Sequence, residues 1–259
     1  MSQVSRVFNA GIEKIMKEDK STQRKFLETL SEIRYMNVDY LLSIGCFFVP
    51  NSDYLLNYFG DSCLNIEYDF YNYEGDCKWV GHLMIPIRDL YNNVVGFTGY
   101  NPLSRLVEQD NESKGEDNDV PPRYIDSSKN CFDRNKFMLI PNGYDKFLSS
   151  DYVFVLDGVF DALTLASMGY NACSNLGTNL SDECVFLLSF PKRRYIPADN
   201  DLAGLSLLNT IQRKLPNSVS VTQIETKDID EYVNKFGIDK FRNKVDSFLE
   251  SKNLVPIVL

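Results

Sequence analysis

The apolar and polar positions in the second half of the chain follow two alternating periods. A short apolar run, YVFVL at residues 152–156, is followed by a segment whose apolar residues recur every three to four positions, and this order repeats along the chain. Short apolar runs are typical of buried strands, and the longer period is typical of helices. Strands that alternate with helices predict a mostly parallel sheet covered on both faces, an α/β domain over residues 148–259.

The elements of this domain are bounded by turn and capping residues. Gly169 ends one predicted helix, Ser181 is placed to cap the next, and Pro216 stops the third. We interpret the basic run at 192–194, where the third strand begins, as a solvated edge. We expect strands at 152–156, 171–175, 193–198 and 218–224, and helices at 160–168, after 181, and at 202–215, 230–237 and 238–251.

The first half of the chain begins with helical periodicity. Residues 2–35 read as two amphipathic helices, and Ser21 is placed to cap the second one, which we expect to begin near Thr22. Residues 37–60 read as two further short helices. The N-terminal part is therefore expected to be mainly helical.

A different pattern follows these helices. Residues 63–99 contain runs rich in aromatic and β-branched side chains, which predict a small antiparallel sheet. Residues 107–122 are polar, acidic and almost without apolar side chains, so we expect a mobile loop between strands. Together these segments predict a smaller α+β subdomain over residues 1–147.

Composition narrows the class of protein. With 259 residues, 44% of them apolar, the chain can bury a full core. Its longest apolar stretches fall short of the about 18 residues that a membrane helix needs, and its charged N-terminus lacks the apolar segment of a signal peptide. We therefore expect a cytoplasmic protein without membrane attachment. Six cysteines without a C-x-x-C pair predict free thiols and no structural zinc.

Three pairs of carboxylates follow predicted strands, at or just after the point where each strand ends. The pairs are Asp157 and Asp161, Asp199 and Asp201, and Asp228 and Asp230. Parallel strands bring their carboxyl ends to one edge of a sheet, so we expect these side chains to lie together. A single Asp after a strand is common as a turn or cap residue, but three pairs at successive strand ends favour a shared site.

Carboxylates gathered at one edge need a counter-charge, because like charges a few Å apart cannot all stay ionised. Magnesium prefers carboxylate and water oxygens and commonly binds together with substrate phosphates, and manganese suits similar ligands. The sequence therefore predicts a Mg²⁺ or Mn²⁺ site at this edge. The net charge of −9 agrees with such a cluster, and any binding of nucleic acid would depend on local basic surface.

The segments around these carboxylates resemble the three blocks of the Toprim domain of DnaG-type bacterial and phage primases. The first block is matched by VLDGVFD at 155–161 and by Gly177 and Thr178. The second is matched by the D-x-D at 199–201 with Ala-Gly after it, and the third by KDIDE at 227–231. The resemblance implies roles for the carboxylates. We assign Asp157, as the acid–base group, and Asp161 to catalysis, and we assign the remaining four to the metal: Asp199, Asp201, Asp228 and Asp230.

Two segments before these blocks are similar to the primases more specifically. LMIPIRDLYNNVVGFTGY at 83–100 and PPRYIDSSKNCFDRNKFML at 121–139 resemble segments that precede the Toprim domain in that family. The resemblance implies that three arginines face template and nucleotide phosphates, which a guanidinium fork grips through two hydrogen bonds. These are Arg88, Arg123 and Arg134. Lys227 either contacts a triphosphate or is a surface lysine.

The sequence departs from the family's pattern in three respects. Asp157 stands where the family normally has Glu, and its side chain is shorter by one methylene. An arginine of the family near residues 41–45 is replaced by Ile44. No zinc-binding module precedes the matched segments, so we expect a separate zinc-module protein as a partner.

The resemblance implies synthesis of short RNA primers on single-stranded DNA from nucleoside triphosphates, in phage or plasmid DNA replication and with a replicative helicase as a further partner. Two alternatives stay open. One is a Toprim nuclease, in which the same metals activate water, and the other is an inactive primase relative that binds nucleic acid or a replication partner. The upstream segments favour a primase over a nuclease, and the D-x-D at 199–201 favours an enzyme over a binding protein.

Overall fold

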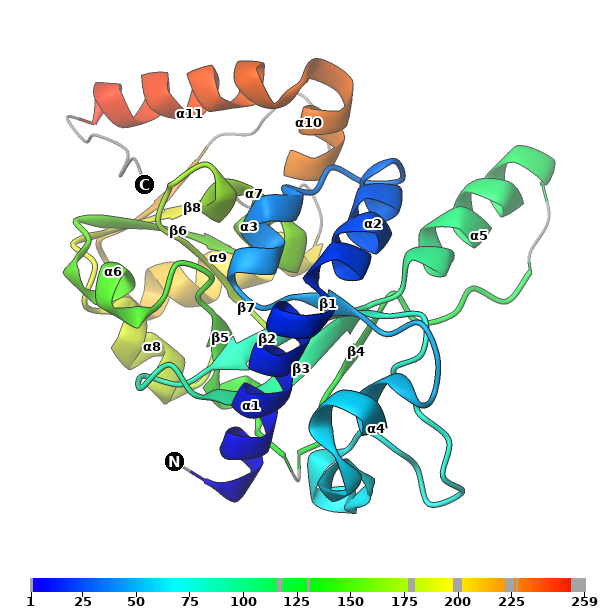
Figure 1. Cartoon of the computed structure of the whole chain (residues 1–259). Helices are drawn as coiled ribbons and strands as arrows, with labels where there is room; N and C mark the ends of the chain where they lie inside the picture. Colours follow the sequence, from blue (N-terminus) through cyan, green and yellow to red (C-terminus); the bar gives the residue numbers. More distant parts are fainter. Residues whose placement is uncertain are drawn as a thin grey trace. The chain divides into compact units, whose positions relative to one another are not determined.

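The structure is a computed structural model in which two compact units can be described separately (Figure 1). It describes residues 2–115, 118–129, 131–176, 180–197, 202–221, 226 and 228–252. The first unit comprises Met1–Asp89 and Asn93–Asp133, and the second comprises Leu90–Asn92 and Arg134–Leu259. The predicted domain division at residues 147 and 148 stays a prediction. None of the described helices is long and apolar enough to cross a membrane.

The first unit is built on an antiparallel sheet with the strand order β1-β2-β3-β4. Its strands are β1 (Phe47–Phe48), β2 (Leu83–Arg88), β3 (Val94–Tyr100) and β4 (Tyr124–Asp126). The antiparallel sheet predicted within residues 63–99 is confirmed by β2 and β3. The aromatic run before them is not a strand but two turns of 3-10 helix, η1 (Asp61–Leu64) and η2 (Ile66–Tyr68).

The described part of the first unit has five α-helices, of which α1 and α4 pack on an aromatic core. They are α1 (Gln3–Glu18), α2 (Lys20–Ser31), α3 (Val38–Ser43), α4 (Tyr54–Phe59) and α5 (Pro102–Lys114). Phe8 of α1 packs against Phe97 of β3 with ring centroids 4.9 Å apart, and Phe59 of α4 contacts Phe70 at 5.0 Å. Edge-on aromatic pairs of this kind hold the helices on the sheet.

Two predictions for the first unit are wrong. Helix α2 begins at Lys20, so Ser21 lies inside the helix, and Asp19 alone joins α1 to α2. Residues 107–114, expected as part of a mobile loop, belong to α5. Helix α5 is defined by residues at both of its ends and not by apolar periodicity. Asn101 Oδ1 accepts from the Leu103 N–H at 3.0 Å, and Gly115 ends the helix in the left-handed conformation.

The second unit contains the predicted α/β sheet, with the strand order β5-β7-β6-β8-β9. Its strands are β5 (Met138–Leu139), β6 (Tyr152–Leu156), β7 (Ala172–Asn175), β8 (Arg193–Ile196) and β9 (Ser218–Ser220). Strand β5 pairs antiparallel with β7, and the other pairings are parallel. The mostly parallel α/β fold class is therefore confirmed.

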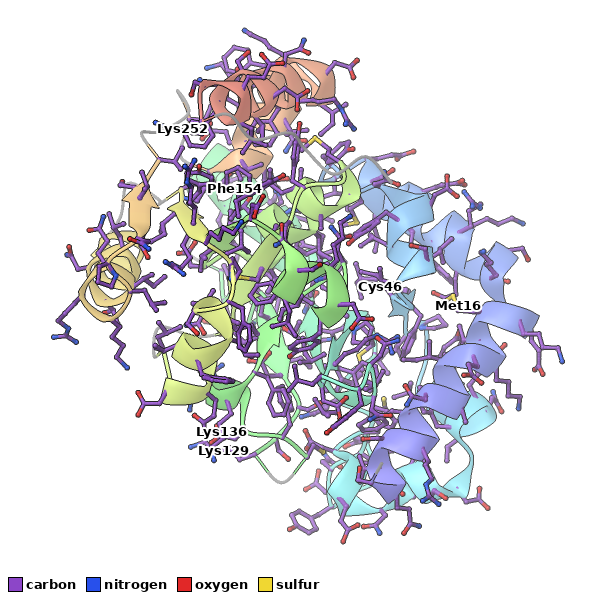
Figure 2. All side chains as sticks on the ribbon, turned by 90° about the vertical axis from the view of Figure 1, so that its left-hand side faces the viewer. Met16, Cys46, Lys129, Lys136, Phe154 and Lys252 are labelled. Atoms are coloured by element: carbon purple, nitrogen blue, oxygen red, sulfur yellow. The ribbon has the colours of Figure 1, made fainter. Side chains whose placement is uncertain are left out.

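The helices of the second unit also follow the sequence pattern. They are α6 (Tyr144–Ser149), α7 (Val159–Ser167), α8 (Asp182–Leu188), α9 (Leu202–Lys214), α10 (Ile229–Phe236) and α11 (Ile238–Ser251), with the short helix η3 (Arg134–Lys136) before them. Ser181 caps α8 as predicted, because its Oγ accepts from the Cys184 N–H at 3.3 Å. Phe154 of β6, labelled in Figure 2, contacts Phe248 of α11 with ring centroids 6.3 Å apart.

All six cysteines are free thiols, as the spacing predicts. Four of them are buried, among them Cys46, which follows α3 (Figure 2). Burial raises the pKa of the Cys46 thiol well above its usual range. Such thiols behave as small apolar side chains of the core.

The basic run at 192–194 is only partly the solvated edge that the sequence indicates. Arg194 is 4% exposed, and its Nη1 donates to the carbonyl oxygens of Leu188 and Pro191, both at 2.8 Å. Its Nε donates to Ser218 Oγ at 3.2 Å, and burial lowers the pKa of the guanidinium. Arg194 therefore connects the end of α8 to β9. The residues around Arg194 in the sequence do not predict this role.

Replacing Arg194 with Met should destabilise the protein by about 2 kcal/mol, because two buried carbonyl oxygens would lose their donor. The matched control is Arg193→Met, which removes an exposed neighbour and should change stability by less than about 0.5 kcal/mol. Urea unfolding followed by circular dichroism measures both. Equal effects of the two substitutions would contradict the structural role of Arg194.

Candidate active site

The junction of β6 and α7 places the first pair of predicted catalytic residues. Asp157 follows Leu156, the last residue of β6, and Gly158 occupies the position before α7. Ser174 on the neighbouring strand β7 donates its hydroxyl to the Asp157 carbonyl oxygen at 3.0 Å. This bond fixes the backbone of Asp157 at the carboxyl end of the parallel strands, where functional groups of such sheets gather.

Asp161 lies in the first turn of α7 with only 5% of its surface exposed. The N-terminal end of a helix carries partial positive charge, which favours a carboxylate at this position. A Cβ atom placed on Gly158 would lie 2.4 Å from Asp161 Oδ2 and 3.2 Å from its Cγ. The absence of a side chain at Gly158 therefore makes the space that the Asp161 carboxylate fills.

The third acidic block begins helix α10, which packs against α7. Asp230 lies in the first turn of α10 and is 5% exposed. Asp228 caps the helix, since its Oδ1 accepts from the Glu231 N–H at 2.8 Å. The hydroxyl of Thr226 donates to the Asp228 carbonyl oxygen at 3.0 Å and further fixes this turn.

Two contacting helices thus each hold a buried carboxylate in their first turn, Asp161 on α7 and Asp230 on α10. The remaining predicted residues of this edge, Asp199, Asp201 and Lys227, lie outside the described residues, as do Gly177 and Thr178. Within the described part of the chain no three Asp, Glu, His or Cys side chains form a group that could hold a metal. The described members of the predicted carboxylate cluster are Asp157, Asp161, Asp228 and Asp230.

Arg88 ends β2 just after a shift in the strand register between Ile87 and Arg88. Its Nη2 donates to the carbonyl oxygen of Ile44 at 3.4 Å, and burial lowers the pKa of its guanidinium. Arg88 is half-buried, and its hydrogen bond to Ile44 ties the side chain to the turn after α3. Ile44, the position where the sequence departs from the primase pattern, thus contributes its backbone to positioning Arg88.

The other two predicted arginines have different surroundings. The Nη2 atom of Arg123 donates to Glu108 Oε2 of α5 at 2.6 Å, in an ion pair that is partly exposed. Arg134 is exposed and begins the short helix η3. Arg88 and Arg123 belong to the first unit and Arg134 to the second.

Asp69 is a structural residue of the first unit that the sequence pattern did not indicate. Its backbone is in the left-handed region with φ of 56°, which is uncommon for a residue with a side chain. Asp69 Oδ2 accepts from the Ser128 N–H at 2.6 Å and from the Lys78 ammonium, and the Asp69 carbonyl accepts from the Trp79 indole at 2.9 Å. These bonds anchor the end of the 121–128 segment. The aromatic residues around Asp69 in the sequence do not predict this contact, because Ser128 is 59 positions away in the chain.

Known proteins resemble the chain in sequence and in fold. Residues 154–233 match the family described as Toprim-like. The DNA primase of Rickettsia bellii is 27% identical over 186 residues, covering 67% of this chain and 28% of that protein. The DNA primase of Enterococcus faecalis is 28% identical over 175 residues, covering 64% of this chain and 26% of that protein. The match therefore spans less than a third of each of these curated relatives.

Solved structures extend the likeness to most of the chain. The Aquifex aeolicus primase, in a structure of its zinc-binding and RNA polymerase domains, has a TM-score of 0.69 at 22% identity, over 94% of this chain and 60% of that one. A DnaG primase catalytic domain bound to single-stranded DNA has a TM-score of 0.70 at 19% identity, over 94% of this chain and 78% of that one. At these identities the likeness is one of fold.

Proposed function

We propose that this chain, which contains a Toprim-like domain and has the fold of the DnaG-type primase catalytic core, joins ribonucleoside triphosphates on a single-stranded DNA template. The observation that carries the proposal is the pair of buried carboxylates, Asp161 and Asp230, in the first turns of two contacting helices. A buried carboxylate is costly unless a cation or hydrogen bonds compensate it. A pair of them at the expected edge of a Toprim-like domain is suited to a divalent cation.

The donor chemistry of this edge fits magnesium or manganese. Carboxylate oxygens are the ligands that these hard cations take in proteins, usually with water and substrate phosphates. Asp161 and Asp230 would hold the ions together with the predicted ligands Asp199, Asp201 and Asp228. When bound, divalent ions lower the pKa of an attacking hydroxyl and offset charge on the leaving group.

The reaction is the attack of a 3′-hydroxyl on the α-phosphorus of a nucleoside triphosphate, with release of pyrophosphate. In our proposal the Asp157 carboxylate accepts the proton of that hydroxyl. The hydrogen bond from Ser174 to the Asp157 backbone would hold this residue at the strand end. Asp157→Glu would restore the length of the family's side chain and should support synthesis.

The basic residues would bind phosphates of template and nucleotides. Arg88, held by the Ile44 carbonyl, presents a pre-oriented guanidinium. Arg123 would exchange its partner Glu108 for a phosphate, so Glu108→Gln should strengthen its contact with nucleic acid. Arg134 is exposed, and Lys227 lies outside the described residues.

The test is incorporation of labelled ribonucleotides on single-stranded DNA. We expect short RNA products with magnesium or manganese, and none when the metal is chelated, because the carboxylate edge would lose its counter-charge. A zinc-module protein and a replicative helicase, the partners that we propose, are added in parallel reactions. Such a reaction would take place in the cytoplasm, where template and nucleotides are available.

Each other outcome of these reactions has a distinct meaning. Absence of RNA in every reaction, with intact template, would reject a primase and favour a protein that only binds nucleic acid. Metal-dependent loss of the template would favour a nuclease instead. RNA that persists when the metal is chelated would reject the assignment of the carboxylates.

A further inference from the structure

Helices α10 and α11 form a helical hairpin (Figure 1). Lysine side chains of this hairpin lie over its aromatic rings. Lys240 and Lys244, one turn apart on α11, reach over Phe236 and Tyr232, which are one turn apart on α10. The ammonium of Lys240 lies 4.2 Å from the centroid of the Phe236 ring, and that of Lys244 lies 5.1 Å from the centroid of the Tyr232 ring. The ammonium of Lys235 approaches Phe236 as well, at 5.2 Å. We call these five residues the lysine–aromatic ladder.

Two lysines of the ladder have aromatic rings as partners and no carboxylate partner among the described residues. The side chains of Lys235 and Lys240 are exposed, and in the described part of the chain neither forms an ion pair with a carboxylate. By contrast, five other lysines do form such ion pairs: Lys78, Lys114, Lys136, Lys192 and Lys214. An aromatic face attracts an ammonium without neutralising its charge. Lys235 and Lys240 therefore keep their positive charge available on a chain whose net charge is −9.

The ladder continues from the carboxylate edge of the second unit. Helix α10 begins beside Asp228 and Asp230 and ends at Phe236. A helix rises about 1.5 Å per residue, so the Phe236 end of the ladder lies roughly 10 Å along the axis from these carboxylates. A strand held at the carboxylate edge would need to extend by only a few nucleotides to place its phosphates beside Lys235 and Lys240.

We propose that the lysine–aromatic ladder is a binding surface for single-stranded DNA, which its lysines hold through backbone phosphates. The complementarity is between the ammonium groups of Lys235 and Lys240, which form no ion pair with a carboxylate of the described residues, and a chain of phosphates. This pairing dominates affinity for single strands. The rings keep the lysine stems ordered, so less conformational entropy is lost when a phosphate binds. The identification of this DNA as the template rests on the proposed function.

The test measures binding without metal or nucleotides, so that it does not depend on catalysis. Fluorescence anisotropy of a labelled oligothymidylate of roughly 16 nucleotides is recorded over a range of salt concentrations. The variant is Lys235→Gln with Lys240→Gln, which keeps most of each aliphatic stem. Each phosphate contact contributes about 0.7 to the slope of log affinity against log salt, so the variant should lose about 1.4 of the slope. Its affinity should fall roughly 25-fold at 0.1 M salt and little near 1 M.

The matched control is Lys17→Gln with Lys25→Gln, which makes the same change in charge at two exposed lysines of α1 and α2. Equal slopes and affinities for the ladder variant and this control would overturn the proposal. Thermal unfolding verifies that both variants are folded, as expected for exposed side chains.

The same binding measurement with other labelled polyanions distinguishes DNA from an acidic protein or RNA as the ligand. If the ladder variant lost affinity for labelled polyglutamate or oligouridylate but kept its affinity for oligothymidylate, the surface would belong to an acidic protein or to RNA, and the proposal would fail. If the protein bound oligothymidylate through the ladder but made no RNA, the proposed primase function would be rejected. The proposal that the ladder binds single-stranded DNA would still stand.

Discussion

Asp161→Asn is expected to reduce ribonucleotide incorporation about 10- to 100-fold. The substitution keeps the shape of the side chain but removes its negative charge, and the change of one group that holds or orients a metal commonly costs 10- to 100-fold in affinity or activity, roughly. Since Asp161 is 5% exposed, an anion from solution cannot take the place of the missing carboxylate. Initial rates of RNA synthesis, measured over a range of magnesium concentrations, give the result.

The matched control for this substitution is Asp182→Asn. Asp182 also begins a helix of the second unit, but its side chain is 98% exposed and pairs with Lys214 at 3.2 Å. It should change RNA synthesis by less than about twofold, since exposed ion pairs contribute little. Activity of Asp161→Asn equal to that of the control would remove Asp161 from the site.

Gly158→Ala is expected to lower both stability and activity through contact with the Asp161 carboxylate. The backbone of Gly158 has φ of −77° and ψ of 125°, which alanine adopts readily, so the effect does not come from backbone strain. The new methyl group would lie 2.4 Å from Asp161 Oδ2 and would displace it. We expect a loss of about 3 kcal/mol in the free energy of unfolding. A displacement of about 1 Å at a catalytic group can cost roughly 100-fold in rate.

A double-mutant cycle isolates this contact. In an Asp161→Ala background the carboxylate is gone, and Gly158→Ala should then cost less than about 1 kcal/mol in urea unfolding. An equal cost in both backgrounds would show that the methyl group is unfavourable for a reason other than Asp161. The cycle is its own control, because each substitution is compared with and without the other.

The α/β domain was predictable because its signals are local. Apolar runs, the Ser181 cap and the glycine after α7 all act within a few residues, and the structure confirms the strands and helices that they predict. The match of residues 154–233 to a Toprim-like family, and the fold likeness to primase catalytic cores, confirm the resemblance. The same local reasoning failed at α5, where a capped helix is almost free of apolar periodicity.

The candidate site was predictable only in part. Carboxylates after strands gave its place in the fold, and the structure buries Asp161 and Asp230 there. The anchoring of the 121–128 segment by Asp69 and the holding of Arg88 by Ile44 were not predictable. Both depend on hydrogen bonds between residues more than 40 positions apart in the chain.

Periodicity and capping act over a few neighbouring positions, so they were enough to predict the described strands and helices after residue 148 and the carboxylates that follow the strands. Three contacts became visible only in the folded chain: α7 packs against α10, Gly158 makes room for Asp161, and the buried Arg194 connects α8 to β9. The folded chain also places lysines of α11 over rings of α10. These features depend on how separate elements pack, which a pattern along one chain does not encode locally.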